Sequence, residues 1–300
     1  MLPALTRYLE LGKAYGIAQS FIRKANKKKE KNINQAYQLI CCDLDGTLLN
    51  EKDEVSEKNK EMIQRCRKQG MQFAIVSGRP VEGILQLIKQ WQMEEMVDYV
   101  IGMNGGVVYH CKTAIKKEYH RLDGAIIKAI MEHYAGWKVR FIIFDGAKRD
   151  VSYSDEDTKR LAASYCGQEV QTDMFTLCDV PRNKLIVLCY PQDMPKVEAH
   201  GKQYHNAQCV CFRTAADLFE FVNPQVNKSS GIQKLCEDIG ITMQEVLAFG
   251  DTSNDNEMLR DAGLGVWLCN GSEDTKAMAD AVAKANTESG VGCFLEEYIL

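Results

Sequence analysis

The sequence predicts an α/β protein in which a doubly wound parallel sheet, a Rossmann-like core, carries a smaller inserted α/β cap domain. Three observations support this fold class. Apolar runs alternate with helical patterns at both ends of the chain, acidic motifs directly follow two of those runs, and neighbouring strand patterns replace the alternation in the middle. We expect the core domain at residues 37–108 and 223–300, the cap at 109–222, and a separate basic extension at 1–36.

The first half of the core is predicted from three apolar strands with helices between them. Continuous apolar runs are typical of strands buried on both faces of a parallel sheet. The expected strands cover residues 39–42, 71–77 and 99–101, and the expected helices cover 56–69 and 80–90. This strand–helix order predicts parallel pairing, because each helix carries the chain back to the start of the next strand.

The middle of the chain has a different pattern. Strands are expected at residues 140–144, 150–153, 184–190, 208–213 and 218–222, and helices at 124–134, 155–165 and 195–204. Neighbouring strands with intervening helices favour an antiparallel or mixed sheet covered on one face. The alternating pattern then resumes, with helices expected at 229–239, 254–262 and 272–285 and strands at 246–249 and 265–268.

The extension differs from the rest of the chain in charge. Residues 1–32 carry eight basic and two acidic side chains, a net charge of +6, whereas the whole chain has −4. One interpretation is a helix that binds a membrane surface or a partner, and the other is a solvated extension, which two glycines in the segment favour. The body does not have the basic face that a nucleic-acid-binding protein requires.

Composition also bears on location. No run of about 18 apolar residues is present, so we expect no membrane span. The N-terminus lacks the apolar core and cleavage site of a secretory signal, and twelve cysteines without a C-x-x-C pair suit a reducing compartment. We therefore expect a cytoplasmic protein, and we interpret Cys209, Cys211 and His205 as ordinary strand residues rather than zinc ligands. The sequence does not indicate an oligomeric state.

The strongest chemical feature is a pair of aspartates after the first apolar strand. Asp43 and Asp45 are followed by Gly46, which permits a tight turn that brings backbone N–H groups toward an anion. In an open parallel sheet, ligands bind beyond the carboxyl ends of the strands. Residues two apart in a strand point to one side, so we expect the two carboxylates to leave the strand end together.

A second acidic group follows the apolar run at 246–249. It contains Asp251 and Asp255, and Asp251 would approach Asp43 and Asp45 if the two strands are neighbours in the sheet. Clustered carboxylates repel one another unless a cation lies between them, and oxygen-only ligands favour Mg²⁺. The alternative, in which these aspartates only cap helices, explains one cluster but not both.

Two further segments are consistent with a phosphate site. Ser77 and Gly78 end a strand and open a helix, where an anion is favoured, and Lys228 opens the helix that follows the inserted region. Competing sites are not predicted. A nucleotide-triphosphate loop, a complete dinucleotide fingerprint and a G-x-S-x-G nucleophile elbow are absent, and no histidine lies near the acidic motifs.

Taken together, the motifs resemble those of the haloacid dehalogenase superfamily of phosphatases. The matching segments, in order, are D-L-D-G-T-L-L at 43–49, V-S-G-R-P at 76–80, N-K-x-x-G at 227–231 and G-D-x-x-N-D-x-x-M-L at 250–259. The long insertion between the second and third motifs is similar to the cap of the Cof-like branch. The resemblance covers residues 37–300.

The resemblance implies a role for each motif residue. Asp43 would be the nucleophile, Asp45 the general acid and base, and Lys228 a catalytic cation. Mg²⁺ would be bound by Asp43, the main-chain carbonyl of Asp45 and Asp251, with Asp255 in support. The phosphate and substrate contacts would come from Leu44 through its N–H, Thr47, Ser77, Gly78, Asn104, Gly105, Lys228 and Asn254.

The function expected from these roles is Mg²⁺-dependent hydrolysis of a small phosphomonoester through an aspartyl-phosphate. A sugar phosphate, a nucleotide or a phosphorylated cofactor would each be compatible, since nothing in the cap sequence identifies the leaving group. A phosphomutase or phosphotransferase would use the same core residues and differs only in the acceptor. A non-catalytic binding module is the third alternative, and the complete motif set argues against it.

Overall fold

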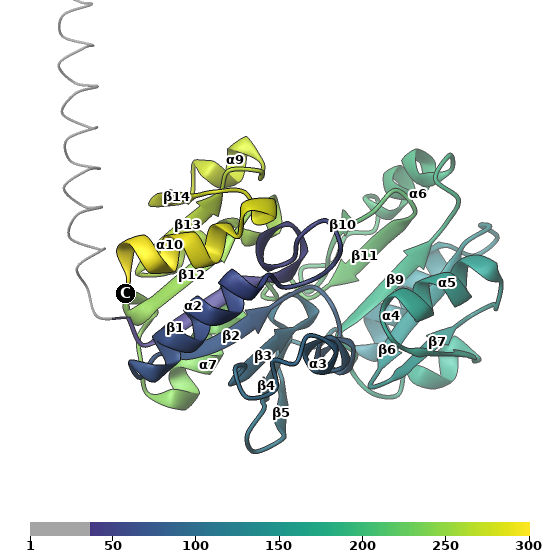
Figure 1. Ribbon diagram of the computed structural model, residues 1–300. Coiled ribbons are helices and arrows are strands. Elements are labelled where there is room, and N and C mark those ends of the chain that lie inside the picture. The colour runs from purple at the N-terminus through teal and green to yellow at the C-terminus, as the bar shows by residue number, and fades with distance from the viewer. Residues whose placement is uncertain (1–36) are drawn as a thin grey trace, which may run out of the picture.

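The computed structural model describes residues 37–300, so the predictions for the extension at 1–36 lie outside the described residues. Two sheets organise this part of the chain and confirm the predicted α/β class (Figure 1). The first has eight strands in the order β14-β13-β12-β1-β2-β3-β4-β5, and the second has six in the order β10-β11-β9-β6-β7-β8. Within residues 37–300, no helix is both long and apolar enough to cross a membrane.

The first sheet is parallel from β14 to β3 and ends in an antiparallel pair of strands. Its strands are β1 (Leu39–Asp43), β2 (Gln72–Val76), β3 (Tyr99–Gly102), β4 (Val107–His110), β5 (Ile115–Glu118), β12 (Val246–Gly250), β13 (Leu264–Leu268) and β14 (Ala281–Ala283). The central strand β1 pairs with β2 on one side and β12 on the other, and all five of its residues are buried. This neighbourhood places the ends of β1 and β12 side by side.

Helices cover the two faces of this sheet in the alternation expected of a buried strand. The helices are α2 (Glu57–Lys68), α3 (Val81–Gln90), α7 (Lys228–Ile239), α8 (Asn256–Asp261), α9 (Glu273–Lys276) and α10 (Gly290–Tyr298). On β1, Ile40 and Cys42 belong to the core cluster that includes side chains of α2, α3 and α10. Leu39 and Cys41 belong to the cluster on the opposite face, with side chains of α7 and α8.

The second sheet is antiparallel except for the pair β7–β8. Its strands are β6 (Arg140–Asp145), β7 (Lys148–Val151), β8 (Gln168–Gln171), β9 (Lys184–Leu188), β10 (Val210–Arg213) and β11 (Leu218–Val222), and its helices are α4 (Gly124–His133), α5 (Glu156–Ser164) and α6 (Met194–Gly201). Leu185 and Phe219 lie in the cluster with α4 and α6. Ile186 and Leu218 face the other way and join the cluster of the first sheet.

Two sequence predictions need correction. The helix expected at 272–285 is wrong: only α9 is helical, and Ala281–Ala283 forms strand β14 beside β13. Asp280, the residue before β14, stabilises the pairing of β14 with β13. Its N–H donates to the Gly265 carbonyl at 2.8 Å, and its carboxylate accepts from the Gly265 N–H. The expected start of the cap at residue 109 falls inside β4, which pairs with β3 of the first sheet.

Candidate active site

The end of β1 leads into a short irregular turn, η1 (Leu44–Leu48), which carries the first acidic motif. Gly46 has a φ of 81°, in the left-handed region. A Cβ atom at this position would lie 2.3 Å from Oδ2 of Asp251. Glycine therefore permits both the turn and the close approach of the chain to the end of β12. Leu44 begins the turn with its side chain buried in the core.

Asp251 follows β12 and is held from two directions. The Thr47 hydroxyl donates to its Oδ1 at 2.8 Å. Oδ2 of Asp255 accepts the backbone N–H groups of Asp251 at 2.9 Å and Thr252 at 3.1 Å. Thr47, expected to contact substrate, thus orients an aspartate in this structure, and Asp255 fixes the loop that carries it.

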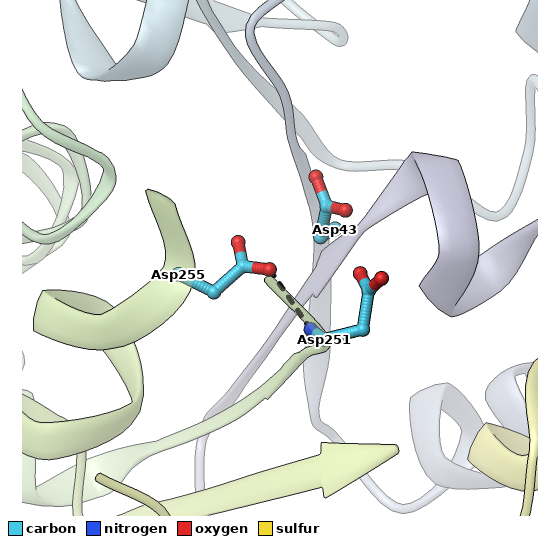
Figure 2. Close-up of side chains that lie close together, drawn as sticks. All are labelled: Asp43, Asp251 and Asp255. Carbon is cyan, nitrogen blue, oxygen red and sulfur yellow. Dashed lines mark hydrogen bonds between the residues drawn. The ribbon is translucent and has the colours of Figure 1, made fainter. Parts of the chain in front are cut away.

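Three buried aspartates meet at this point, from the ends of β1 and β12 (Figure 2). Asp43, Asp251 and Asp255 each offer a carboxylate oxygen, and these oxygens lie within 4.8 Å of one another. Lys228 joins the group: its Nζ donates to Oδ1 of Asp43 at 2.6 Å and to Oδ1 of Asp255 at 2.5 Å. Sequence reasoning predicted from the strand ends that Asp251 would approach Asp43, whereas the third carboxylate of the group is Asp255 and not the expected Asp45.

Lys228 is the first residue of α7. Asn227 caps this helix, its side chain accepting the Ser230 N–H at 2.8 Å. The helix end packs closely on the loop after β3, where Asn104 and Gly105 have positive φ values of 55° and 100°. A Cβ on Gly105 would lie 2.0 Å from the Asn227 carbonyl oxygen. Gly105 therefore allows the N-terminal end of α7 to pack directly against this loop.

Burial dominates the electrostatics of the cluster. It raises the pKa of Asp43 well above its usual range, with Lys228 opposing the shift and Asp255 and Asp251 adding to it. Burial likewise raises the pKa of Asp251 to about 6, although its hydrogen bond from Thr47 acts in the opposite direction. Burial by itself would lower the pKa of Lys228, but Asp255 and Asp43 raise it above its usual value. Burial thus makes the charged forms of Asp43 and Asp251 costly.

This donor set fits a hard divalent cation. The available donors are carboxylate oxygens alone, and a divalent cation bound between them would favour the charged forms that burial disfavours. Asp255 already binds Lys228 and two backbone N–H groups, so Asp43 and Asp251 are the better candidates for direct ligands. The residues present therefore fit Mg²⁺.

Asp45 does not join this cluster. Its carboxylate accepts two hydrogen bonds from Arg79, at 3.0 Å from Nε and 2.6 Å from Nη2, and its side chain is 53% exposed. The two aspartates of the first motif therefore point to different places, because the chain leaves the strand at Asp43 and has turned by Asp45. Sequence reasoning gave Arg79 no role, although it lies within V-S-G-R-P and that position was the available signal.

A cavity of about 320 Å³ opens in front of the cluster. Its walls include six residues predicted from the sequence: Asp43, Asp45, Ser77, Gly78, Asn104 and Asn254. The opposite wall comes from the second sheet and its helices, with Tyr165, Lys184, Thr214 and Glu220. Those four residues were not predicted, because their position depends on how the two sheets face each other.

The remaining predicted residues line a neighbouring hollow or support the walls. Lys228 borders an adjoining cavity of about 670 Å³ that shares Asn104 and Asn254 with the first. Ser77 directly follows β2, and its hydroxyl accepts the Arg79 N–H at 3.2 Å. Asn254 accepts a hydrogen bond from the Thr252 hydroxyl at 2.9 Å. Each lies at the carboxyl edge of the first sheet.

Comparison with known proteins agrees with this geometry. A family model for haloacid dehalogenase-like hydrolases matches residues 40–295. A 5-amino-6-(5-phospho-D-ribitylamino)uracil phosphatase of Bacillus subtilis is 28% identical over 269 residues, covering 87% of this chain and 97% of the relative. An HMP-PP phosphatase of Cronobacter sakazakii is 25% identical over 236 residues, covering 76% and 82%. A crystal structure of a haloacid dehalogenase-like hydrolase from Bacteroides thetaiotaomicron has a TM-score of 0.78 at 29% identity, covering 87% of this chain and 98% of that one.

Proposed function

The chain belongs to the haloacid dehalogenase-like hydrolases, and from this premise we propose that it is a Mg²⁺-dependent phosphatase of small phosphomonoesters that works through an aspartyl-phosphate. The observation that carries the proposal is the buried Asp43 beside Lys228, Asp251 and Asp255, at the floor of a cavity sized for a small metabolite. A cytoplasmic location remains a prediction.

Asp43 is the nucleophile of this proposal. One of its oxygens accepts Lys228 at 2.6 Å, which leaves the other oxygen for attack on phosphorus. The new bond joins that oxygen to phosphorus, and the bond from phosphorus to the leaving alcohol breaks. Splitting the displacement in two in this way replaces one difficult step by two easier ones.

The attack brings together two anions, the Asp43 carboxylate and the phosphate, so positive charge is needed to offset their repulsion. Lys228 supplies one fixed cation, held in place by Asp255. Mg²⁺, held by Asp43, Asp251 and the main-chain carbonyl of Asp45, would add charge that neutralises the phosphate and the nucleophile. Thr47 and the turn at Gly46 keep Asp251 in position for this role.

Asp45 is the proton carrier. It gives a proton to the leaving oxygen in the first step, and in the second it takes one from the water that attacks phosphorus, which releases phosphate and restores Asp43. Its carboxylate is paired with Arg79 at the cavity wall, so it must exchange at least one of those hydrogen bonds for the reacting oxygen. The exposed position of the pair leaves room for such an exchange.

The substrate class follows from the size of the cavity and from the relatives. The cavity volume of about 320 Å³ supports a leaving group of sugar size. The two curated relatives are named for phosphorylated metabolites, a ribitylaminouracil phosphate and HMP-PP. We extend to this chain only their shared character, a small phosphorylated organic molecule.

Free phosphate is the product to measure. We expect purified protein with Mg²⁺ to release inorganic phosphate from p-nitrophenyl phosphate and from members of a panel of small phosphomonoesters, and to stop when a chelator removes the metal. Recovery of an isomerised ester without free phosphate would indicate a phosphomutase. Absence of any product from the aryl ester, at saturating Mg²⁺, would contradict the proposal.

A further inference from the structure

The wall that the second sheet contributes to the cavity carries a buried ion pair. Lys184, the first residue of β9, donates from Nζ to Oε1 of Glu220 on β11 at 2.9 Å. Their side chains are 5% and 4% exposed. Both residues line the same cavity as Asp43 and Asp45. Charged side chains are seldom placed in such a position without a function or a compensating partner.

Glu220 is only half satisfied. Its Oε1 accepts Lys184 and, at 3.3 Å, the Thr214 hydroxyl, whereas its Oε2 is buried without a hydrogen-bond partner among residues 37–300. An unpaired buried carboxylate oxygen is costly, because it has lost water and gained nothing in return. A pair that served the fold alone would have no reason to leave this buried oxygen unpaired in the wall of a cavity.

Tyr165 connects this pair to the reacting end of the cavity. Burial raises the pKa of Tyr165, and four charges act on it: Lys184 and Arg79 lower the pKa, while Glu220 and Asp45 raise it. Tyr165 and all four of these residues line the same cavity. A leaving group that fills this cavity while its phosphate lies at Asp43 would lie beside Glu220.

We propose that Glu220 and Lys184 determine specificity, with Oε2 of Glu220 accepting a hydrogen bond from an O–H or N–H group on the leaving part of the substrate. The inference rests on the proposed phosphatase function, which fixes the phosphate at Asp43. Lys184 keeps donors beyond the one it gives to Glu220, so it can serve a neighbouring oxygen of the same molecule. An alkyl chain would leave Oε2 buried and unpaired, and the site rejects it for that reason.

Three phosphates of equal carbon number test the proposal in the wild-type protein: sorbitol 6-phosphate with hydroxyl donors, 6-aminohexyl phosphate with an ammonium donor, and n-hexyl phosphate with neither. We expect kcat/KM for at least one donor-bearing ester to exceed that of the hexyl ester by about tenfold or more. The donor-bearing ester with the higher kcat/KM shows whether the preferred donor is an O–H or an N–H group. Equal kcat/KM for all three esters would overturn the proposal, whereas inactivity on p-nitrophenyl phosphate would count against the phosphatase function itself.

Two variants locate the selectivity. Glu220→Gln removes the charge at nearly constant shape, and the double change Lys184→Met with Glu220→Leu replaces the pair by apolar side chains of similar volume. We expect the ratio of kcat/KM between the donor-bearing and hexyl esters to fall toward one in each. Asp157→Asn is the matched control, because it breaks a 2.8 Å ion pair between α5 and Arg140 of β6. This variant should keep the wild-type ratio of kcat/KM between the donor-bearing and hexyl esters.

The outcomes are distinct. A folded Glu220→Gln protein with unchanged selectivity, or with all three esters slowed by one common factor, would show that the pair is only structural and would overturn the proposal. Thermal melting of each variant reports folding. If neither variant folds, the wild-type comparison of the three esters decides alone.

Discussion

Asp43 and Asp45 are two residues apart and have different environments. Asp43 is buried with Lys228, while Asp45 is half exposed and bound to Arg79. A carboxylate in the first position suits attack within a dry, charge-compensated site. One in the second can reach solvent and exchange protons with it. The division of roles implied by the motif is therefore compatible with the geometry, although the expectation that the two carboxylates leave the strand together is not met.

Replacement of Asp45 tests its role through the leaving group. Asp45→Asn cannot protonate the leaving oxygen, so turnover of an alkyl phosphate should fall by about a hundredfold to ten-thousandfold. The loss in the first step should be smaller for p-nitrophenyl phosphate, whose leaving group departs without a proton. Pre-steady-state release of p-nitrophenol is the measurement, because slow breakdown of the intermediate would hide a fast first step. Equal losses of that first step on both esters would contradict the assignment of Asp45.

At the scale of elements, the active site depends on how the N-terminal end of α7 packs against the loop after β3. The first residue of this helix is Lys228, which contacts Asp43. The N-terminus of the helix packs against the loop at Gly105, where there is no space for a side chain. A change at this contact would move a catalytic cation without touching it. Small displacements of that kind are expensive in catalysis.

Gly105→Ala tests this dependence. The new methyl group would collide with the Asn227 carbonyl and take up a left-handed φ, so we expect lower thermal stability and a fall in kcat on the order of a hundredfold. Gly240→Ala is the matched control: it has a φ of 77° at the other end of α7, but nothing lies within 4 Å of its added Cβ. That variant should lose some stability and keep its turnover. Equal turnover in the two variants would rule out this role of Gly105.

The elements that sequence analysis predicted correctly were those whose local pattern determines their environment. The runs at 39–42 and 246–249 are apolar throughout because parallel strands are buried on both faces, and they form β1 and β12. The segment 272–285 has a helical pattern, but pairing with β13 overrides it after α9. Lys184 and Glu220 were not predicted because their contacts depend on how distant segments face each other, which local patterns do not encode.

For the whole molecule, the acidic cluster links metal binding to folding. Since burial raises the pKa of Asp251 to about 6, the folded metal-free protein binds this proton more tightly than the unfolded chain, where the pKa is near 4. Protonation thus stabilises the fold below about pH 4, and this contribution is lost as the pH rises through 6. The raised pKa of Asp43 has the same sign.

We therefore predict that Mg²⁺ raises the melting temperature more at pH 7.5 than at pH 5. At the higher pH the cation stabilises ionised carboxylates that burial makes costly, and at the lower pH it must first displace a proton. Melting curves with Mg²⁺ and with chelator at each pH give the comparison. Asp251→Asn should abolish most of the difference. A stabilisation by Mg²⁺ that is the same at both pH values and unaffected by that substitution would argue against the proposed site.

The central claim is that Asp43 becomes phosphorylated, and a rapid quench of Asp45→Asn with p-nitrophenyl phosphate tests it most directly. That variant should accumulate the intermediate, because it lacks the base that activates water. Acid quenching, proteolysis and mass spectrometry should find one phosphoryl group on the peptide that contains Asp43, and none after Asp43→Asn is added to the same background. A phosphoryl group on another residue, or undiminished turnover of p-nitrophenyl phosphate by Asp43→Asn alone, would contradict the account.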